Sequence, residues 1–366
     1  MFRVPLTATL ALVLFANVLL AGCERAAAPT AADTVALATA PAATSDGPTL
    51  KSYFDNTGHS DVLAGGVRKI EINTPKGKFK VWTKRVGNNP RIKMLILHGG
   101  PGATHEAYEA FDSFLPAEGI EYYYYDQLGS AFSDQPTDPS LWNTDRFVNE
   151  VEQVRTALGL GKDNFYLYGQ SWGGILAIEY ALKYPQNLKG LVISNMMSSI
   201  PAYNKYAHDV LMPKMDPAVL KEILALEAKK DYANPRYEEL LTNNFYNDHI
   251  LRMPPDQWPD PVLRSFGRLN KNVYIPMQGP SEMGASGILE NWDRSHDLKK
   301  ISVPTLVIGA QYDTMDPEHM AWMATQFPHG RFLLCKNGSH LAIYDDQQTY
   351  MTGLIAFLKD VDGGRM

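Results

Sequence analysis

The chain has 366 residues, with 34 Lys plus Arg against 40 Asp plus Glu, which gives a formal charge of −6. Apolar residues make up 45% of the chain and charged residues 20%, an ordinary globular composition that excludes a wholly disordered chain or a coiled coil. The mildly acidic balance carries no electrostatic footprint for nucleic acid, so no nucleic-acid partner is expected.

The first 22 residues have the pattern of a secretion signal. Arg3 is the only charged side chain, and the mostly apolar stretch after it ends in small residues. The sequence Leu-Ala-Gly-Cys at 20–23 resembles the bacterial lipobox, in which the cysteine is lipid-modified and becomes the first residue of the mature chain. The resemblance implies an exported bacterial lipoprotein that is anchored to the membrane only through Cys23; the alternative is a plain cleavable signal with a chance cysteine. Glu24 after the cysteine, by resemblance to Gram-negative lipoproteins, implies the periplasmic face of the outer membrane.

Residues 24–50 are rich in Ala, Thr and Pro and show no hydrophobic periodicity. Such a segment cannot bury enough apolar surface to offset the entropy lost on ordering. Together with Cys23 it is predicted to form a flexible tether over 23–50. No second stretch of 18 or more apolar residues follows, so we expect no transmembrane helix further along the chain.

From about residue 66 the sequence alternates between strand and helix patterns. Alternating residues on either side of a turn at 74–77 predict a hairpin of strands at 68–73 and 78–83. Short apolar runs then predict six strands, at 94–97, 122–125, 165–168, 191–194, 305–308 and 332–334. Helix patterns fall at 142–158, 174–184, 317–326 and 347–359. Continuous apolar strands separated by helices predict an α/β fold, with a mostly parallel sheet covered on both faces.

The alternation is interrupted once and then resumes. The intervening residues have helix-like runs near 217–229 and 235–251 and no buried-strand pattern. We therefore predict one α/β domain, with a core at 51–196 and 301–366 and a mainly helical cap at 197–300. An independent second domain is the alternative, which the return of the sheet pattern disfavours.

The motif Gly-Gln-Ser-Trp-Gly at 169–173 runs directly from a predicted strand into a predicted helix. Gly-x-Ser-x-Gly at such a junction forms a sharp turn that presents the serine hydroxyl at the edge of the sheet. Ser171 is therefore the predicted nucleophile. The alternative, a structural glycine-rich turn, is disfavoured by the strand-to-helix context.

A serine nucleophile needs a general base, and the base needs an orienting carboxylate. In this arrangement the order along the chain is serine, acid, histidine. Asp313 and His340 each follow a predicted strand, so both are expected at the same sheet edge as Ser171. Asp316 is the rival acid, but the proline directly after it is typical of a helix start and predicts an N-cap.

The sequence His-Gly-Gly-Pro-Gly at 98–102 follows another predicted strand. A tetrahedral oxyanion needs two backbone N–H donors, one from the residue after the nucleophile and one from this earlier loop. We interpret Trp172 as the first donor, and Gly99 or Gly100 as the second. His98 is interpreted as a hydrogen-bond donor that fixes the loop and not as the base.

No metal or cofactor is implied. The sequence lacks His-Glu-x-x-His, and its two cysteines, Cys23 and Cys335, have no partner at ligand spacing. No Gly-x-Gly-x-x-Gly or Walker-type loop follows a predicted strand. With Cys23 predicted to carry lipid, Cys335 is expected to be a lone, buried thiol.

These motifs together resemble the proline iminopeptidase branch of the serine α/β-hydrolases. The resemblance covers most of residues 66–360 and rests on the segments at 98–102, 125–130 and 169–174 and on the loops that carry Asp313 and His340. It implies the α/β-hydrolase fold and hydrolysis of the bond after an N-terminal residue, often proline, through an acyl-enzyme on serine. One departure is Ala-Phe at 131–132, where the family often continues with Gly-Arg.

The resemblance also implies acids in the cap that bind the free ammonium of the substrate. A carboxylate in a partly desolvated pocket is an economical acceptor for such a group. Glu282 is the best match by resemblance, with Glu238 or Glu239 as the second acid, of which we assign Glu239; a solvated helix face is the alternative for both. Four aromatic residues of the cap are expected in the core instead of against the substrate: Tyr237, Phe245, Tyr246 and Trp258.

The leading hypothesis is a serine aminopeptidase or amidase that acts on short peptides or amino-acid amides. The alternative is an esterase or lactonase that uses the same triad without ammonium recognition. Epoxide hydrolases and dehalogenases of similar fold carry Asp where Ser171 stands, which disfavours their chemistry. A tethered, non-enzymatic binding protein is the third class, and the intact set of Ser171, Asp313 and His340 disfavours it. The sequence does not define the preferred N-terminal residue or the oligomeric state.

Overall fold

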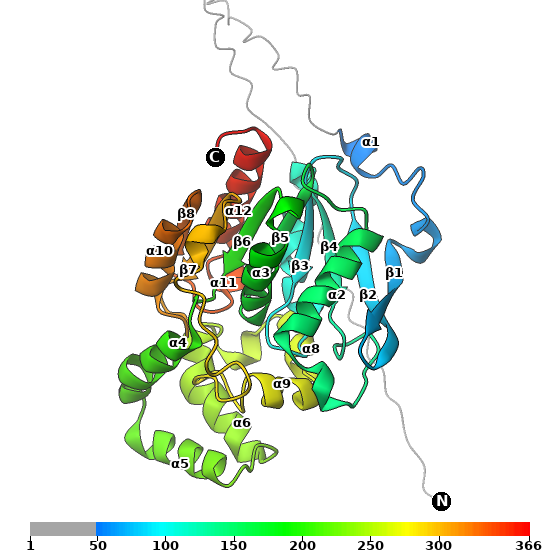
Figure 1. The fold of residues 1–366 in the computed structure, drawn as a ribbon. Helices are drawn as coiled ribbons and strands as arrows, with labels where there is room; N and C mark the ends of the chain where they lie inside the picture. Colours follow the sequence, from blue (N-terminus) through cyan, green and yellow to red (C-terminus); the bar gives the residue numbers. More distant parts are fainter. Residues whose placement is uncertain (1–48) are drawn as a thin grey trace, which may run out of the picture. The chain divides into compact units, whose positions relative to one another are not determined.

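An eight-stranded, mostly parallel sheet organises residues 49–366, the part of the chain that the computed structural model describes (Figure 1). Its strands are β1 (Val67–Thr74), β2 (Gly77–Val86), β3 (Lys93–Leu97), β4 (Glu121–Asp126), β5 (Phe165–Gln170), β6 (Gly190–Ser194), β7 (Thr305–Ala310) and β8 (Gly330–Cys335). They lie in the order β1-β2-β4-β3-β5-β6-β7-β8, with β2 antiparallel to both its neighbours and all other pairs parallel. The predicted hairpin and the six later strands are confirmed.

The predicted signal at 1–22, the lipidation of Cys23 and the tether up to residue 48 lie outside the described residues. Helix α1 (Leu50–Tyr53) begins at the last residue of the predicted tether, with the side chain of Thr49 as its N-cap. Tyr53 is buried, and its hydroxyl donates to the Ile120 carbonyl at 3.0 Å, which fastens this segment to the domain. None of the helices within 49–366 has the length and apolar character that a membrane span requires.

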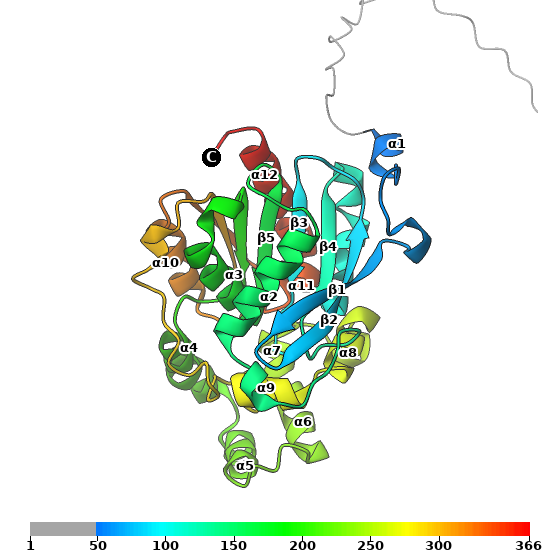
Figure 2. The same cartoon turned by 45° about the vertical axis from the view of Figure 1, so that its right-hand side comes forward.

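Alternating side chains on the central strands build one core layer on each face of the sheet. In β4, Tyr123 and Tyr125 pack into one layer and Tyr122 and Tyr124 into the other, because successive strand residues point to opposite faces. The first layer is covered by α2 (Thr144–Ala157), α3 (Trp172–Lys183) and α10 (Pro317–Gln326). The second is covered by the 3-10 helix η2 (His105–Ser113), α11 (Ala342–Asp345) and α12 (Gln347–Asp362) (Figures 1 and 2). The four helices predicted for the core are confirmed, whereas η2 and α11 were not predicted.

A mainly helical insertion, residues 195–304, connects β6 to β7. Its helices are α4 (Ile200–Tyr206), α5 (Pro217–Ala228), α6 (Pro235–Leu241), α7 (Asn247–His249), α8 (Asp260–Gly267) and α9 (Lys271–Met277). The run predicted at 217–229 is confirmed, whereas the run at 235–251 is divided into α6, a π-helical turn at Thr242–Tyr246 and α7. In Figure 1 the helices of the insertion gather at one end of the sheet.

Ion pairs join the insertion to the rest of the domain. Arg264 of α8 pairs with Glu106 and Glu109 of η2, both at 2.5 Å, and Arg268 pairs with Glu106 at 2.8 Å. The side chain of Glu106 is only 3% exposed. Because a buried carboxylate without a partner is strongly destabilising, these arginines hold α8 against η2.

Candidate active site

Ser171 stands at a sharp turn between β5 and α3. Its backbone has φ of +55°, a conformation that is strained for a residue with a side chain, and its N–H donates to the Ser194 carbonyl at 3.0 Å. A Cβ at Gly169 would lie 2.0 Å from the Gly173 carbonyl oxygen, and a Cβ at Gly173 would lie 2.1 Å from the Leu97 carbonyl oxygen. Both glycines are therefore required by close approach of the backbone, and the turn presents Ser171 to the cavity described below.

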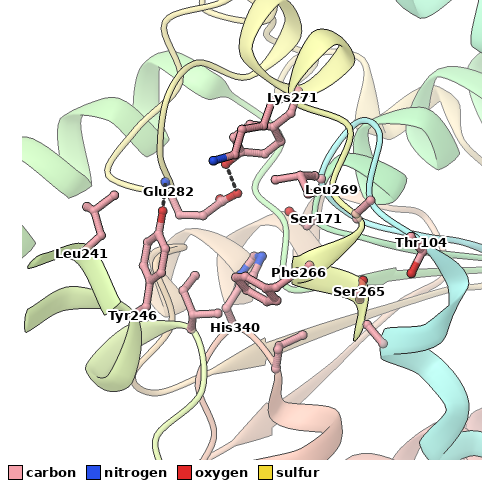
Figure 3. Close-up of a pocket in the computed structure, with 18 of the residues that line it drawn as sticks. Thr104, Ser171, Leu241, Tyr246, Ser265, Phe266, Leu269, Lys271, Glu282 and His340 are labelled. Carbon is pink, nitrogen blue, oxygen red and sulfur yellow. Dashed lines mark hydrogen bonds between the residues drawn. The ribbon is translucent and has the colours of Figure 1, made fainter. Parts of the chain in front are cut away.

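Asp313 and His340 form a buried pair at the ends of β7 and β8. His340 Nδ1 lies 2.7 Å from Asp313 Oδ1, and the Met315 N–H donates to the same oxygen at 3.1 Å. Nδ1 therefore donates to Asp313, which leaves Nε2 as the nitrogen that can accept a proton. Within 49–366 no hydrogen bond to Nε2 is present, and His340 lines the same cavity as Ser171 (Figure 3).

The rival acid, Asp316, has the structural role that the sequence predicted. Its Oδ1 accepts a hydrogen bond from the Glu318 N–H at 2.9 Å, and Pro317 is the first residue of α10. This is an N-cap, so the Asp316 carboxylate is already used at the helix start.

The Asp313–His340 pair determines how the site should respond to pH. Burial alone would lower the pKa of His340, but the charge of Asp313 and the hydrogen bond to it outweigh burial and raise the pKa above the ordinary value of 6.5. A protonated imidazole cannot accept the serine proton, so we expect kcat/KM to fall with decreasing pH along a limb centred above 6.5. The labelling rate of Ser171 by a fluorophosphonate, measured across a pH series, reports this limb without interference from the substrate amine. A limb centred below 6.5 would contradict the assignment of His340 as the base.

The loop at 98–102 offers one free backbone donor to the cavity. The Gly99 N–H donates to the Tyr108 hydroxyl at 2.8 Å, so it is already occupied. Gly100 lines the cavity, and its N–H has no backbone acceptor among the described residues. Trp172 is the first residue of α3, so its N–H has no acceptor within the helix. Gly100 and Trp172 stay the predicted oxyanion donors, and the alternative of Gly99 is disfavoured.

His98 fixes this loop, as predicted. The ring is fully buried; Nε2 accepts from the Gln127 N–H at 3.1 Å, and Nδ1 lies 2.9 Å from the Gly99 carbonyl. Burial lowers the pKa of His98 to about 4, so the ring is neutral and Nδ1 is the donor. With both nitrogens occupied, His98 cannot serve as the base.

A cavity of about 310 Å³ lies between the sheet edge and the insertion. Figure 3 shows Ser171, His340 and Glu282 around this space. Glu282 Oε1 accepts from the Tyr274 hydroxyl, and the Glu282 N–H donates to the Tyr246 hydroxyl at 3.3 Å. Oε2 is buried and has no hydrogen-bond partner within residues 49–366. Because an unpaired buried carboxylate oxygen is costly, this atom is suited to a donor from outside the protein.

The structure corrects the second acid. Glu239 was predicted to bind substrate, but its side chain is 56% exposed on the outside of α6 and pairs with Arg236 at 3.2 Å. The neighbouring Glu238 lines the cavity instead. Successive helix residues point about 100° apart, and at position 239 this rotation has carried the side chain away from the cavity.

The aromatic residues of the insertion divide between core and cavity. Tyr237, Phe245 and Trp258 are buried and Tyr246 is half-buried. Phe245 and Trp258 belong only to the core, as predicted, whereas Tyr237 and Tyr246 also line the cavity. The expectation that none of them meets the substrate space is therefore wrong for these two tyrosines. Phe132, at the departure from the family pattern, packs on Trp82 with ring centroids 5.4 Å apart and does not line the cavity.

Cys335, the cysteine within the described residues, lies in the core of the domain. Cys335 is free and buried, and burial raises the pKa of its thiol. Across the described part of the chain, no group of three or more His, Cys, Asp or Glu side chains is arranged to hold a metal ion.

Sequence reasoning missed the residues that support the site from behind. The Tyr108 hydroxyl donates to Gln170 Oε1 at 2.8 Å, and Gln170 Nε2 donates to the His340 carbonyl at 3.0 Å. Gln170 thus links the glycine-rich loop to the histidine loop. The only sign of Gln170 in the sequence was its place just before the nucleophile. Because the Gly-x-Ser-x-Gly motif allows any residue there, that place alone did not predict a role.

A serine on a strand-to-helix turn, a buried acid–histidine pair and free backbone donors define a serine hydrolase of the α/β-hydrolase fold. A family model described as the alpha/beta hydrolase fold matches residues 93–347. Proline iminopeptidases of Flavobacterium johnsoniae and Elizabethkingia meningoseptica are 58% and 59% identical to the chain, covering 80% of it and 98% of each relative. The chain belongs to the proline iminopeptidase family and is a serine aminopeptidase.

Solved structures agree with this fold. The crystal structure of VinJ has a TM-score of 0.74 at 27% identity and covers 80% of this chain and 99% of its own. A proline iminopeptidase of Mycobacterium smegmatis has a TM-score of 0.70 at 26% identity and covers 81% of this chain and 100% of its own.

Proposed function

We propose that the enzyme removes N-terminal residues, with proline favoured, from short peptides or amino-acid amides through an acyl-enzyme on Ser171. The observation that carries this proposal is the buried, unpaired Oε2 of Glu282 beside the cavity that Ser171 and His340 also line. The name of the relatives at 55–59% identity supports the preference for proline.

In the proposed mechanism Ser171 Oγ attacks the carbonyl carbon of the N-terminal residue while its proton passes to His340 Nε2. Asp313 holds the imidazole by Nδ1 and stabilises the imidazolium that forms. The N–H groups of Gly100 and Trp172 stabilise the oxyanion. His340 then gives the proton to the leaving amine, and the peptide bond breaks. Water, deprotonated by His340, attacks the acyl-enzyme by the same route and releases the free amino acid.

Glu282 gives this chemistry its end specificity. A substrate ammonium bound at Oε2 places the carbonyl of the first residue within reach of Ser171, so the cut falls after that residue. Glu238 is the second acid in this proposal, because it lines the cavity. The insertion acts as the cap that encloses the bound end.

A substrate panel tests the proposal. Free prolyl arylamide is expected to be turned over fastest among free aminoacyl arylamides, and acetylation of the amine is expected to abolish turnover. Equal rates on acetylated and free substrates, or rapid turnover of simple esters alone, would favour the esterase or lactonase alternative.

We also propose that the enzyme is a lipoprotein at the periplasmic face of the outer membrane, held only through Cys23. The support is the signal pattern at 1–22, the Leu-Ala-Gly-Cys sequence at 20–23 and Glu24 after it. Acyl chains contribute about 0.8 kcal/mol per buried CH₂, so several chains hold a protein firmly. In a bacterial host the wild type should require detergent for release from the outer membrane, and Cys23→Ala should not. Release of the wild type without detergent would contradict the anchor.

A further inference from the structure

The two carboxylate oxygens of Asp313 have different hydrogen-bond partners. Oδ1 faces His340 Nδ1 and accepts from the Met315 N–H at 3.1 Å and from the Thr314 hydroxyl at 3.3 Å. Oδ2 accepts from Asn195 Nδ2 at 2.7 Å, and among the described residues Oδ2 has no other hydrogen-bond partner. Since the terminal torsion of an aspartate is broad, a carboxylate bonded through one oxygen can rotate, and the bond from Asn195 fixes its plane.

The amide of Asn195 is itself held in one orientation. The Ser194 hydroxyl donates to Asn195 Oδ1 at 2.7 Å, and Nδ2 makes a second bond to the Ser339 carbonyl at 3.2 Å. An asparagine amide has one accepting and one donating end. These partners require that the donating end face Asp313.

The chain of hydroxyls behind Asn195 has a single direction. Ser194 has one proton, which it donates to Asn195, so the Tyr350 hydroxyl at 2.7 Å from Ser194 Oγ must donate to it. Tyr350 has then used its own proton, so the Tyr168 hydroxyl, 2.5 Å away, must donate to Tyr350. Burial raises the pKa of both tyrosines, which keeps both hydroxyls protonated. Every donor in this series therefore points toward Asp313.

The backbone of Asn195 also marks the position as unusual. Its φ is +50°, in the left-handed region, and its N–H donates to the Ile308 carbonyl of β7 at 2.8 Å. Asparagine tolerates this conformation better than most side-chain residues, but the strain must still be offset by neighbouring contacts. Asn195 is 1% exposed, so the whole arrangement lies away from solvent.

We propose that Asn195 is a positioning residue, which fixes the carboxylate of Asp313 against His340 and is itself oriented by the directed series Tyr168–Tyr350–Ser194. This inference rests on the proposed function, because it assigns Asn195 to the Ser171, Asp313 and His340 machinery.

The decisive variant is Asn195→Gly, which accepts the positive φ and removes the side chain that carries the amide. We expect kcat to fall about 10- to 100-fold with little change in KM, since a buried hydrogen bond to a charged group is lost. The acid limb of the fluorophosphonate labelling rate should move about half a pH unit to lower pH, because a mobile Asp313 raises the pKa of His340 less. Glu282 and Asp345, the other acids that raise the pKa of His340, are unchanged in this variant.

Two further variants test whether the loss of kcat becomes smaller with distance from Asp313 along the series Tyr168–Tyr350–Ser194. Ser194→Ala removes the group that orients the amide and should cost about 5-fold in kcat, and Tyr168→Phe, at the far end, should cost less. Thermal denaturation of each variant separates this order from simple loss of stability. If Asn195→Gly does not fold, Ser194→Ala decides the question by the same two readouts.

An unchanged kcat and acid limb in the folded variant would overturn the inference. So would losses of kcat that follow the thermal stabilities instead of the position in the series. A shift of the acid limb to higher pH would show that Asn195 only weakens the negative charge of Asp313 and does not position it. That result would also overturn the inference. Failure of the wild-type enzyme to react at Ser171 would instead refute the proposed function, which keeps the two results distinct.

Discussion

Replacing Ser171 with alanine is expected to lower kcat for prolyl arylamide by at least about 10⁴-fold, because the variant has no nucleophile and retains only binding and oxyanion stabilisation. Fluorophosphonate labelling, followed by intact mass, should be lost at the same time. The fold should persist, since the hydroxyl of Ser171 makes no hydrogen bond within the described residues. Undiminished turnover in a folded Ser171→Ala variant would refute the acyl-enzyme mechanism.

Two aspartates three positions apart supply a matched control for the same machinery. Asp313→Asn should cost about 10³- to 10⁴-fold in kcat, because the amide no longer holds His340 in the tautomer that accepts the serine proton. Asp316→Asn should leave activity near the wild-type value, since asparagine caps a helix about as well as aspartate. The reverse pattern would make Asp316 the orienting acid.

Replacing Glu282 with glutamine is expected to lower kcat/KM for free prolyl arylamide by about 10²- to 10⁴-fold. Removal of one partner from a buried ion pair costs about 3–5 kcal/mol, and each 1.36 kcal/mol is tenfold in rate. Glu282 also raises the pKa of His340, so labelling of Ser171 by a small fluorophosphonate is compared on the plateau above the acid limb. There it should be unchanged, because that probe carries no ammonium.

Glu239→Gln is the matched control for this effect. The same chemical change is made on the outer side of α6, where Glu239 pairs with Arg236, and activity should not change. If Glu282→Gln had as little effect as Glu239→Gln, the enzyme would not recognise the substrate amine at Glu282, and the esterase or lactonase alternative would gain support.

The strands and the catalytic loops could both be predicted from the sequence, for a common reason. Helices cover both faces of the sheet, so each central strand reads as a continuous apolar run. The parallel strands then bring the residues that follow them to one edge. Ser171, Asp313 and His340 were found by this rule, and Asn195 follows β6 in the same way. It was missed because an asparagine carries no chemistry of its own in a triad, and its side-chain partners come from the end of β6 and from the loops after β7 and β8.

The insertion was harder to read. Two adjacent glutamates on α6 are equivalent in the sequence, and only the rotation of the helix in the fold decides that Glu238 lines the cavity and Glu239 does not. Glu282 lies in an irregular segment after α9, where no periodicity marks it, so only the family resemblance pointed to it. Tyr246 was expected in the core, and its contact with the Glu282 backbone crosses 36 positions of sequence, which no local pattern reveals.

The insertion also limits which polypeptides the enzyme can attack. Ser171 opens into a partly enclosed cavity of about 310 Å³, which α8 helps to line and where Arg264 and Glu106 fasten that helix. A loose peptide end can enter this space, whereas the end of a folded chain is joined to a body that cannot follow it. We therefore expect intact folded proteins, including other copies of the enzyme, to be attacked far more slowly than short peptides.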